Sequence, residues 1–260
     1  MRPITQFNPR DIKGILTDLD DTITIGRKFH WRVLEGMYRL KERGFRVILV
    51  TGRPAGWCDC LLRLLPIDGI VGENGALYFY KENEIVKHRF MLPEEELKEN
   101  RKRLEKIRDI ILSKVPEAKV AKDQFSRVND LAIDFSEDIY PPLSIEKVKL
   151  IYSIFKENGA NAKISSIHVN GWFGDFNKLI TFLVMAKELW NESKEYVTEH
   201  YVYCGDSPND AEMFKFFKNS VGMGNLKRFI KLLKEDELPA YITDREEGYG
   251  FLEVVERLVS

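Results

Sequence analysis

The stretch from Gly14 to Thr22, Gly-Ile-Leu-Thr-Asp-Leu-Asp-Asp-Thr, joins an apolar run directly to three carboxylates within four residues. A carboxylate at the end of a buried strand is costly unless it is paired or bound to a metal. If the strand continues through the acidic residues, Asp18 and Asp20 point to the same side, since residues i and i+2 share a face. Two such carboxylates suit a hard cation such as Mg²⁺, although Asp-Asp pairs are also common in surface turns.

The composition limits the possible partners. The chain has 260 residues, of which 44% are hydrophobic and 12% aromatic, enough for one large α/β domain or two smaller ones. Lys plus Arg total 40 and Asp plus Glu total 41, so no net field attracts nucleic acid or an anionic membrane. No apolar run approaches the roughly 18 residues of a membrane span. We therefore expect no nucleic-acid or membrane partner, and a monomer or a homodimer.

The cysteines and the start of the chain bear on location. Cys58, Cys60 and Cys204 have no spacing typical of a disulfide framework, which favours a reducing compartment. The first residues lack the apolar core of a signal peptide. These features predict a cytoplasmic protein.

The first fifty residues predict a strand, a helix and a second strand. Residues 12–19 suit a buried strand, apolar residues recur at helical spacing over 33–40, and residues 45–50 suit the second strand. Such a unit is parallel and right-handed, so both strands end at the same edge of the sheet. Open parallel sheets bind ligands at that edge. We expect Thr51-Gly52-Arg53, which follows the second strand, to lie beside Asp18.

The middle of the chain has a different character. From about Lys81 a charged helix is expected, followed by a strand at 128–135, a helix at 144–158 and a single strand at 162–169. We interpret this part as a smaller α/β unit inserted into the first. The predicted fold is therefore α/β, with a Rossmann-like parallel-sheet core domain at 1–80 and 172–260 and an inserted α/β cap domain at 81–171.

The strand-and-helix alternation resumes at Lys178, which opens an apolar helix. A strand at 201–204 ends in the turn Gly-Asp-Ser-Pro-Asn-Asp at 205–210. Carboxylates, Thr51 and Lys178 thus fall at strand ends or at a helix start, and together they could hold a cation and an anion such as phosphate. Phosphoryl transfer needs this combination of positioning and charge neutralisation. One carboxylate can act as the nucleophile and another as general acid and base.

In this order the motifs resemble those of haloacid dehalogenase superfamily phosphatases of the Cof type, which are related to the sugar-phosphate phosphatases and to phosphomannomutase. Residues 18–22 match D-x-D-x-T, residues 50–53 read Val-Thr-Gly-Arg, Lys178 is the third motif, and residues 205–210 match G-D-x-x-N-D. Residues 73–76 and 221–225 also look like that branch. The resemblance covers nearly the whole chain.

The resemblance implies roles for the acidic residues. Asp18 would be the nucleophile and a metal ligand. Asp20 would be the general acid and base, and it would also bind the metal through its backbone carbonyl. Asp206 would be a further ligand of Mg²⁺, supported by Asn209 and Asp210. Many relatives have Gly in place of Asp21, which receives no role.

The remaining roles concern the phosphoryl group and the substrate. By the same resemblance, Thr51, Gly52 and Lys178 would hold the phosphoryl group, and the cap would close over the site and select the substrate. Around Lys178 the sequence departs from the commonest pattern of the family. Some further residues could touch the substrate, although a structural role is more common for each type. They are Arg53, Asn74 and Asn225 and, in or next to the cap, Arg127, His168 and Trp172.

The sequence thus predicts a Mg²⁺-dependent phosphatase that hydrolyses a small phosphorylated metabolite through an aspartyl phosphate, with a sugar phosphate favoured. A phosphomutase is an alternative, because it would share the aspartyl phosphate but return the phosphoryl group to a sugar. A phosphatase of the phosphoglycolate type is another. A binding protein without turnover is disfavoured by the intact set of carboxylates.

Overall fold

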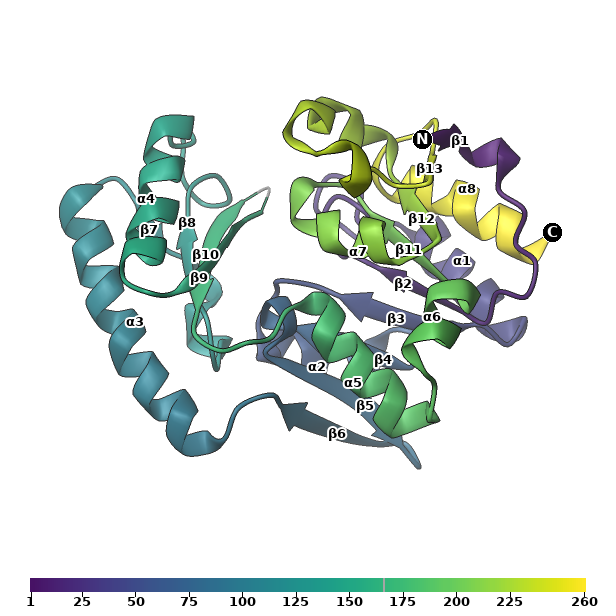
Figure 1. Ribbon diagram of the computed structural model, residues 1–260, viewed down its shortest axis with the longest axis horizontal. Helices are drawn as coiled ribbons and strands as arrows, with labels where there is room; N and C mark the ends of the chain where they lie inside the picture. The colour runs from purple at the N-terminus through teal and green to yellow at the C-terminus, as the bar shows by residue number, and fades with distance from the viewer. Residues whose placement is uncertain (166) are drawn as a thin grey trace.

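The chain forms two sheets in the computed structural model, which describes residues 1–165 and 167–260 (Figure 1). The larger sheet has nine strands in the order β1-β13-β12-β11-β2-β3-β4-β5-β6. Their bounds are Arg2–Pro3 (β1), Gly14–Thr17 (β2), Arg46–Val50 (β3), Gly69–Gly72 (β4), Leu77–Glu82 (β5), Ile85–Phe90 (β6), Tyr201–Gly205 (β11), Asn219–Gly222 (β12) and Tyr241–Ile242 (β13).

Taken in their order across the sheet, the strands β1, β13, β12, β11, β2, β3 and β4 are all parallel to their neighbours. The strands β5 and β6 add an antiparallel edge. Parallel neighbours need crossover connections, and helices supply them. The helices of this part are Trp31–Glu42 (α1), Ala55–Leu64 (α2), Lys178–Trp190 (α5), Lys194–His200 (α6), Ala211–Phe216 (α7) and Glu247–Val259 (α8).

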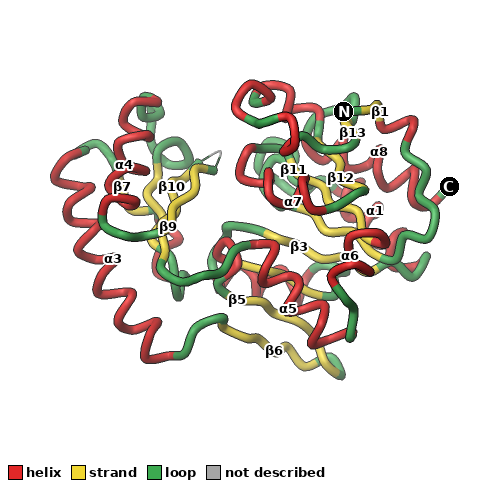
Figure 2. The backbone as a smooth tube through the Cα atoms, in the orientation of Figure 1, coloured by secondary structure: helices red, strands yellow, loops and turns green. Residues whose placement is uncertain are grey.

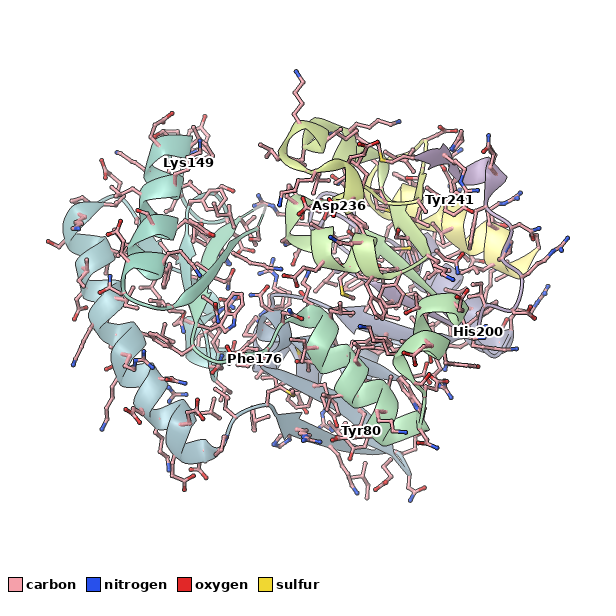
Figure 3. All side chains as sticks on the ribbon, viewed as in Figure 1. Tyr80, Lys149, Phe176, His200, Asp236 and Tyr241 are labelled. Carbon is pink, nitrogen blue, oxygen red and sulfur yellow. The ribbon has the colours of Figure 1, made fainter. Side chains whose placement is uncertain are left out.

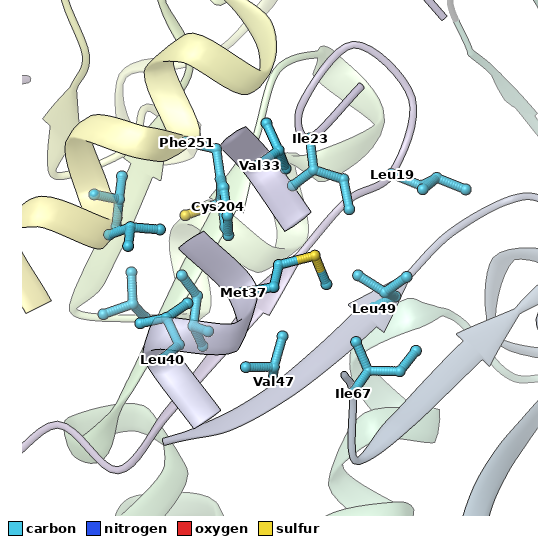
Figure 4. Packing of buried hydrophobic residues seen from close by; sticks show 14 of the residues in the cluster. Leu19, Ile23, Val33, Met37, Leu40, Val47, Leu49, Ile67, Cys204 and Phe251 are labelled. Atoms are coloured by element: carbon cyan, nitrogen blue, oxygen red, sulfur yellow. The ribbon is translucent and has the colours of Figure 1, made fainter. Parts of the chain in front are cut away.

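Helices cover both faces of the larger sheet. Successive strand residues point to opposite faces, so Ile15 packs with α1, α2 and α8 while Leu16 packs with α5, α6 and α7. Figure 4 shows the first of these clusters, in which Met37 of α1 lies between Val47 and Leu49 of β3 on one side and Phe251 of α8 on the other. A sheet buried on both faces explains why its strands read as continuous apolar runs.

The smaller sheet is antiparallel and has the order β7-β8-β10-β9. Its strands are Lys119–Val120 (β7), Leu131–Asp134 (β8), Asn161–Ile164 (β9) and His168–Trp172 (β10), and its helices are Glu94–Lys114 (α3) and Ile145–Glu157 (α4). The two helices cover one face and form a separate apolar core with it. Figure 2 shows that two loops join this unit to the larger one, from β6 to α3 and from β10 to α5.

An aromatic cluster lies where the chain returns from the smaller unit. Trp172 at the end of β10 stacks on Phe176, with ring centroids 6.3 Å apart, and both pack with Ala76. Figure 3 shows Phe176 at this junction between the two units. The cluster fixes the path of the chain from β10 into α5.

The predicted α/β architecture, with a parallel-dominated core and a smaller α/β unit, is confirmed. Three details of the prediction are wrong. The first strand ends at Thr17, so strand alternation does not govern Asp18 and Asp20. Residues 162–169, predicted as one strand, contribute to the antiparallel pair β9 and β10, and Ser166 lies outside the described residues.

The third error concerns residues 85–90, which were included in a charged helical region. They form β6 and pair with β5 in the larger sheet, although their range falls inside the predicted cap at 81–171. The stretch reads Ile-Val-Lys-His-Arg-Phe, which lacks the clean alternation of a half-buried strand, so its sequence indicates a strand only weakly. The division at 81–171 therefore stays a prediction. Among the described residues, none of the helices has the length and apolar character needed to cross a membrane.

Candidate active site

Three strand ends bring the first candidate residues together. β2 pairs in parallel with β3 on one side and with β11 on the other. Asp18, Thr51 and Asp206 each follow directly on one of these strands, so they meet at the carboxyl edge of the sheet. The Asp18 amide donates to the Cys204 carbonyl at 2.9 Å, which continues the pairing with β11 for one more residue. The predicted proximity of Asp18 and Thr51-Gly52-Arg53 is thus explained by strand order.

A small pocket, with a cavity volume of about 30 Å³, lies at this edge, between the two units. The larger unit contributes Asp18, Asp20, Thr51, Gly52, Arg53, Asn74, Asp206, Ser207 and Asn209, and the smaller unit contributes Arg127, Ser165, Ile167, His168 and Asn170. Alternation along β10 explains part of the second set, because Val169 packs into the core under α3 and α4 while His168 and Asn170 face the pocket.

Lys178 reaches Asp18 from the first residue of α5. The Asn177 side chain caps this helix by accepting from the Ile180 amide at 2.8 Å, which sets where the helix begins. The Lys178 Nζ lies 2.7 Å from Asp18 Oδ1 and 3.1 Å from Asp210 Oδ1, and all three side chains are buried. Lys178 does not line the pocket, whereas Asp18 does, so the lysine contacts Asp18 from behind the pocket wall.

The charges in this cluster are unbalanced. Burial raises the pKa of Asp18 to about 7, although Lys178 opposes the rise. Burial also raises the pKa of Asp206, and the neighbouring carboxylates of Asp210 and Asp18 add to the effect. Burial would lower the pKa of Lys178, but Asp18 and Asp210 raise it above its usual value. One ammonium therefore faces more carboxylates than it can neutralise.

Asp210 organises the turn that follows β11. Its Oδ1 accepts from Lys178 and, at 2.5 Å, from the Tyr203 hydroxyl, while its Oδ2 accepts from the backbone amides of Asp206 and Ser207. The side chain is fully buried. Asp210 thus fixes both the lysine and the backbone that carries Asp206, in keeping with its predicted supporting position.

Asp206 is oriented by neutral donors. The Asn225 Nδ2 donates to Asp206 Oδ2 at 3.0 Å and to the Asp21 carbonyl at 2.9 Å, and the Thr22 hydroxyl donates to Asp206 Oδ1 at 3.3 Å. Asn225 was predicted as a possible substrate contact. It lies outside the residues that line the pocket and holds Asp206 instead.

Asn209 lies in the same turn. Its Oδ1 accepts from the Ser207 hydroxyl at 3.0 Å, and its carbonyl accepts from Lys163 Nζ of β9 at 3.3 Å. The second contact ties the turn to the smaller unit.

Asp20 is paired with Arg53. The Arg53 Nε donates to Asp20 Oδ2 at 2.9 Å and its Nη2 donates to Asp20 Oδ1 at 2.8 Å, a two-point contact that fixes the carboxylate plane. The guanidinium also lies over the Trp57 ring, 4.5 Å from its centroid. Arg53 lines the pocket as predicted for a substrate contact, but its charge is already matched by carboxylates.

Arg127, another predicted substrate contact, is held by the protein. Its guanidinium pairs with Asp123 and Asp130, and Nη1 donates to the Gly52 carbonyl at 3.0 Å. The side chain is fully buried. Arg127 therefore supports the loop after β3 from the smaller unit.

The other two candidates in the pocket wall differ in their surroundings. Asn74 has a left-handed backbone, with φ of 57°, and its buried side-chain Nδ2 has no protein partner. An unpartnered donor in a pocket wall is suited to contact a ligand. The His168 Nε2 lies 3.0 Å from Glu137 Oε2 in the smaller unit, but it makes no hydrogen bond and is, like Asn74 Nδ2, a buried polar atom without a partner among the described residues.

Glu73 was not predicted to have a role in the site, although it lies in the motif at residues 73–76. Its buried carboxylate accepts four backbone N–H groups, from Ala55 in the larger unit and from Val128, Asn129 and Asp130 in the smaller one. It thereby joins the two units beside the pocket. Tyr203 and Glu137 were missed too, because their partners come from distant parts of the chain and no local pattern marks them.

The sequence comparison decides the family. The sequence model of the haloacid dehalogenase-like hydrolases matches residues 15–123 and 184–235. The chain belongs to this family. The resemblance seen in the motifs is thereby confirmed, as is the expectation of an enzyme of the hydrolase class.

Two curated relatives of this haloacid dehalogenase-like hydrolase align along almost their whole length. The phosphoglycolate phosphatase 1 of Saccharolobus solfataricus is 28% identical over 255 residues, which cover 95% of this chain and 96% of that protein. The phosphoglycolate phosphatase of Methanobrevibacter smithii is 25% identical over 265 residues, covering 96% and 99%.

Solved structures share the fold. Protein 0175 of Thermoplasma acidophilum superposes with a TM-score of 0.72 at 18% identity, covering 95% of this chain and 98% of that one. The sucrose-phosphatase of Synechocystis sp. PCC6803, in complex with sucrose and phosphate, gives 0.65 at 15% identity, covering 97% and 98%. At these identities the likeness concerns the fold alone.

The candidate ligands in this hydrolase suit a cation that takes only a few of its ligands from the protein. Within residues 1–165 and 167–260, no group of three or more His, Cys, Asp or Glu side chains is arranged to hold a metal. The pocket instead offers the carboxylates of Asp18 and Asp206, both buried, with excess negative charge around them. Mg²⁺ typically binds through one or two carboxylates, keeping waters and substrate phosphate oxygens as its other ligands. The residues present therefore fit Mg²⁺.

Proposed function

We propose that this hydrolase is a Mg²⁺-dependent phosphatase that cleaves a small phosphomonoester through an aspartyl phosphate on Asp18. The observation that carries the proposal is the contact of Asp18 Oδ1 with Lys178 Nζ, at 2.7 Å, at the floor of a pocket that also contains Asp20, Thr51 and Asp206. A nucleophilic carboxylate needs such a cation nearby, because the phosphoryl group brings further negative charge.

The chemistry divides between the two aspartates of the first motif. Asp18 attacks phosphorus and forms an acyl phosphate, which turns one difficult displacement into two easier ones. Asp20 gives a proton to the departing alkoxide and then removes a proton from the water that hydrolyses the intermediate. Thr51 and the Gly52 backbone orient the phosphoryl oxygens, and Lys178 keeps Asp18 aligned.

Bound Mg²⁺ would neutralise charge on the phosphoryl oxygens. The carboxylates of Asp18 and Asp206 and the backbone carbonyl of Asp20 would hold it. Asn225 contributes by orienting Asp206, to which it donates at 3.0 Å.

The smaller unit selects the leaving group in this proposal, as expected for a cap at 81–171. Ser165, Ile167, His168 and Asn170 all line the pocket and face the motifs of the larger unit. Closure of the cap excludes bulk water from the pocket and leaves room for the water that hydrolyses the acyl phosphate.

Two substrate classes are supported by different observations. The curated relatives are named phosphoglycolate phosphatases, which favours phosphoglycolate. On the cap side of the pocket, Arg127 is already paired with two aspartates, which disfavours a second anionic group and so favours a sugar phosphate. Ser165 and Asn170 also line the pocket, but the serine hydroxyl and the asparagine amide nitrogen donate to the His168 carbonyl and to Asp130. Comparing kcat/KM for phosphoglycolate and a panel of sugar phosphates decides between them.

The test of the proposal itself is release of inorganic phosphate. Purified protein with Mg²⁺ should release phosphate steadily from a substrate of the panel, and from a generic aryl phosphate. Conversion of a sugar phosphate to its isomer without free phosphate would indicate a mutase instead. Binding without turnover of any substrate would indicate a non-enzymatic protein.

A further inference from the structure

Glu137 of the smaller unit lies in a loop whose backbone is held by hydrogen bonds to Asp134. The loop follows β8, and the carboxylate of Asp134, the last residue of that strand, accepts the backbone amides of Ser136, Glu137 and Asp138 at 2.9, 2.8 and 2.9 Å. Asp134 is itself buried. The backbone under Glu137 is therefore well defined, and its side chain projects toward the larger unit.

The Glu137 carboxylate joins two pocket-lining residues from different units. Its Oε1 lies 2.9 Å from Arg53 Nη2 of the larger unit, and its Oε2 lies 3.0 Å from His168 Nε2 of the smaller one. The side chains of Arg53 and His168 are only 6% and 3% exposed, and that of Glu137 is 23% exposed. Glu137 is thus one of three carboxylates around Arg53, with Asp20 and, at 3.6 Å, Asp123. It lies beside His168 without a hydrogen bond to it.

Arg53 extends this contact to Asp20. Its Nε and Nη2 both face the Asp20 carboxylate, at 2.9 and 2.8 Å, while Nη2 also faces Glu137. The guanidinium is planar, so a carboxylate on its outer edge restricts the direction in which the other edge points. The hydrogen bonds thus run continuously from Glu137 of the smaller unit through Arg53 to Asp20.

We propose that Glu137 is a positioning residue that, through Arg53, holds Asp20 in the orientation needed for proton transfer to the leaving group. The inference rests on the proposed function, in which Asp20 is the general acid. Because Glu137 belongs to the smaller unit and Arg53 to the larger, the arrangement is complete only while the two units are together. The placement of the acid is then coupled to closure over the substrate.

The test uses two substrates that differ in their need for an acid. An alkyl phosphomonoester, the best of the panel, has a poor leaving group and needs a proton, whereas p-nitrophenyl phosphate releases a stable phenolate without one. The value of kcat/KM reports steps up to the first irreversible one, so later hydrolysis of the acyl phosphate does not enter. Glu137→Ala is the test variant, and Asp138→Asn, in the same loop but paired with exposed Lys122, is the control.

We expect Glu137→Ala to lower kcat/KM by about 10- to 100-fold for the alkyl substrate and by about twofold or less for p-nitrophenyl phosphate. Glu137→Gln, which can still accept from Arg53, should recover most of the alkyl activity. Asp138→Asn should match the wild type on both substrates.

Other outcomes distinguish an error about Glu137 from an error about the phosphatase function. Equal losses on both substrates would mean that Glu137 serves only the association of the units, and no loss would mean that Arg53 holds Asp20 unaided. Either result overturns the role of Glu137 and leaves the phosphatase intact. Failure of the wild-type protein to hydrolyse either substrate would overturn the proposed function and the inference together.

Discussion

Lys178 Nζ lies 2.7 Å from Asp18 Oδ1, although 160 positions separate the two residues in the chain. The contact arises because α5 begins where the chain returns from the smaller unit, directly beside the end of β2. Both side chains are almost fully buried. The smaller unit, which lies between the two residues in the sequence, therefore leaves them in contact and adds a second wall to the pocket.

Replacing Asp18, the proposed nucleophile, should abolish turnover without unfolding the protein. In Asp18→Asn the amide cannot form an acyl phosphate, so kcat should fall by roughly 10³-fold or more, both on the best substrate of the panel and on p-nitrophenyl phosphate. The thermal midpoint should not drop, because Lys178 keeps its partner Asp210 and one buried like charge is removed. Residual hydrolysis within tenfold of wild type would assign the nucleophile to another group.

Removing the lysine should affect stability as well as activity. In Lys178→Met the carboxylates of Asp18 and Asp210 stay buried without their cation, which we expect to cost about 3–5 kcal/mol in the free energy of unfolding. Urea unfolding in the presence of EDTA measures the loss. The matched control is Lys218→Met, which breaks an exposed pair with Glu199 and should cost less than about 1 kcal/mol. Equal effects of the two variants would contradict a buried charge cluster.

The predictable part of the site is the part set by strand order. Asp18, Thr51 and Asp206 each end an apolar run, and parallel pairing brings such ends to one edge whatever the details of packing. The motif spacing therefore located these residues, with Lys178 at the start of its helix. Their chemical roles remain proposals, since the fold fixes only where they lie.

The unpredictable part depends on contacts between distant segments. Arg53 and Arg127 look alike as free arginines in the sequence, yet carboxylates from the smaller unit pair with both. Glu73 lies in an ordinary turn sequence, and its four amide partners come from two other segments. β6 was missed because a short, charged edge strand carries a weak periodic signal beside a long charged helix.

Mg²⁺ should stabilise the protein through Asp206. With both Asp18 and Asp206 available, millimolar Mg²⁺ should raise the thermal midpoint relative to EDTA, because the cation binds the folded state only. Asp206→Asn should remove most of this shift. Loss of the amide that orients Asp206, in Asn225→Leu, should weaken Mg²⁺ binding by about 10- to 100-fold. A calorimetric titration with Mg²⁺ alone measures the affinities without reference to activity.

A control and a contradicting result complete this metal test. Asp59→Asn changes an exposed carboxylate that pairs with Arg63, and it should leave the Mg²⁺ affinity unchanged. A wild-type affinity for Mg²⁺ in Asp206→Asn would exclude Asp206 from the metal site.

Glu137 should give the stability of the protein a defined pH dependence. Burial alone would raise the pKa of Glu137, but His168 and Arg53 lower it to about 2, against an ordinary value of 4.5. The folded state thus binds this proton more weakly than the unfolded state, so ionised Glu137 stabilises the fold above about pH 4.5 and loses this contribution as the pH falls toward 2.

Glu137→Gln resembles the protonated side chain, so its free energy of unfolding should be smaller than that of the wild type at pH 6. This difference between the two proteins should shrink steadily below pH 4.5. Urea unfolding of both proteins, from pH 6 down to the lowest pH at which the wild type folds, measures that difference. Asp138→Asn serves as the control from the same loop, and a Glu137→Gln difference that stays constant or grows on acidification would contradict the pairing.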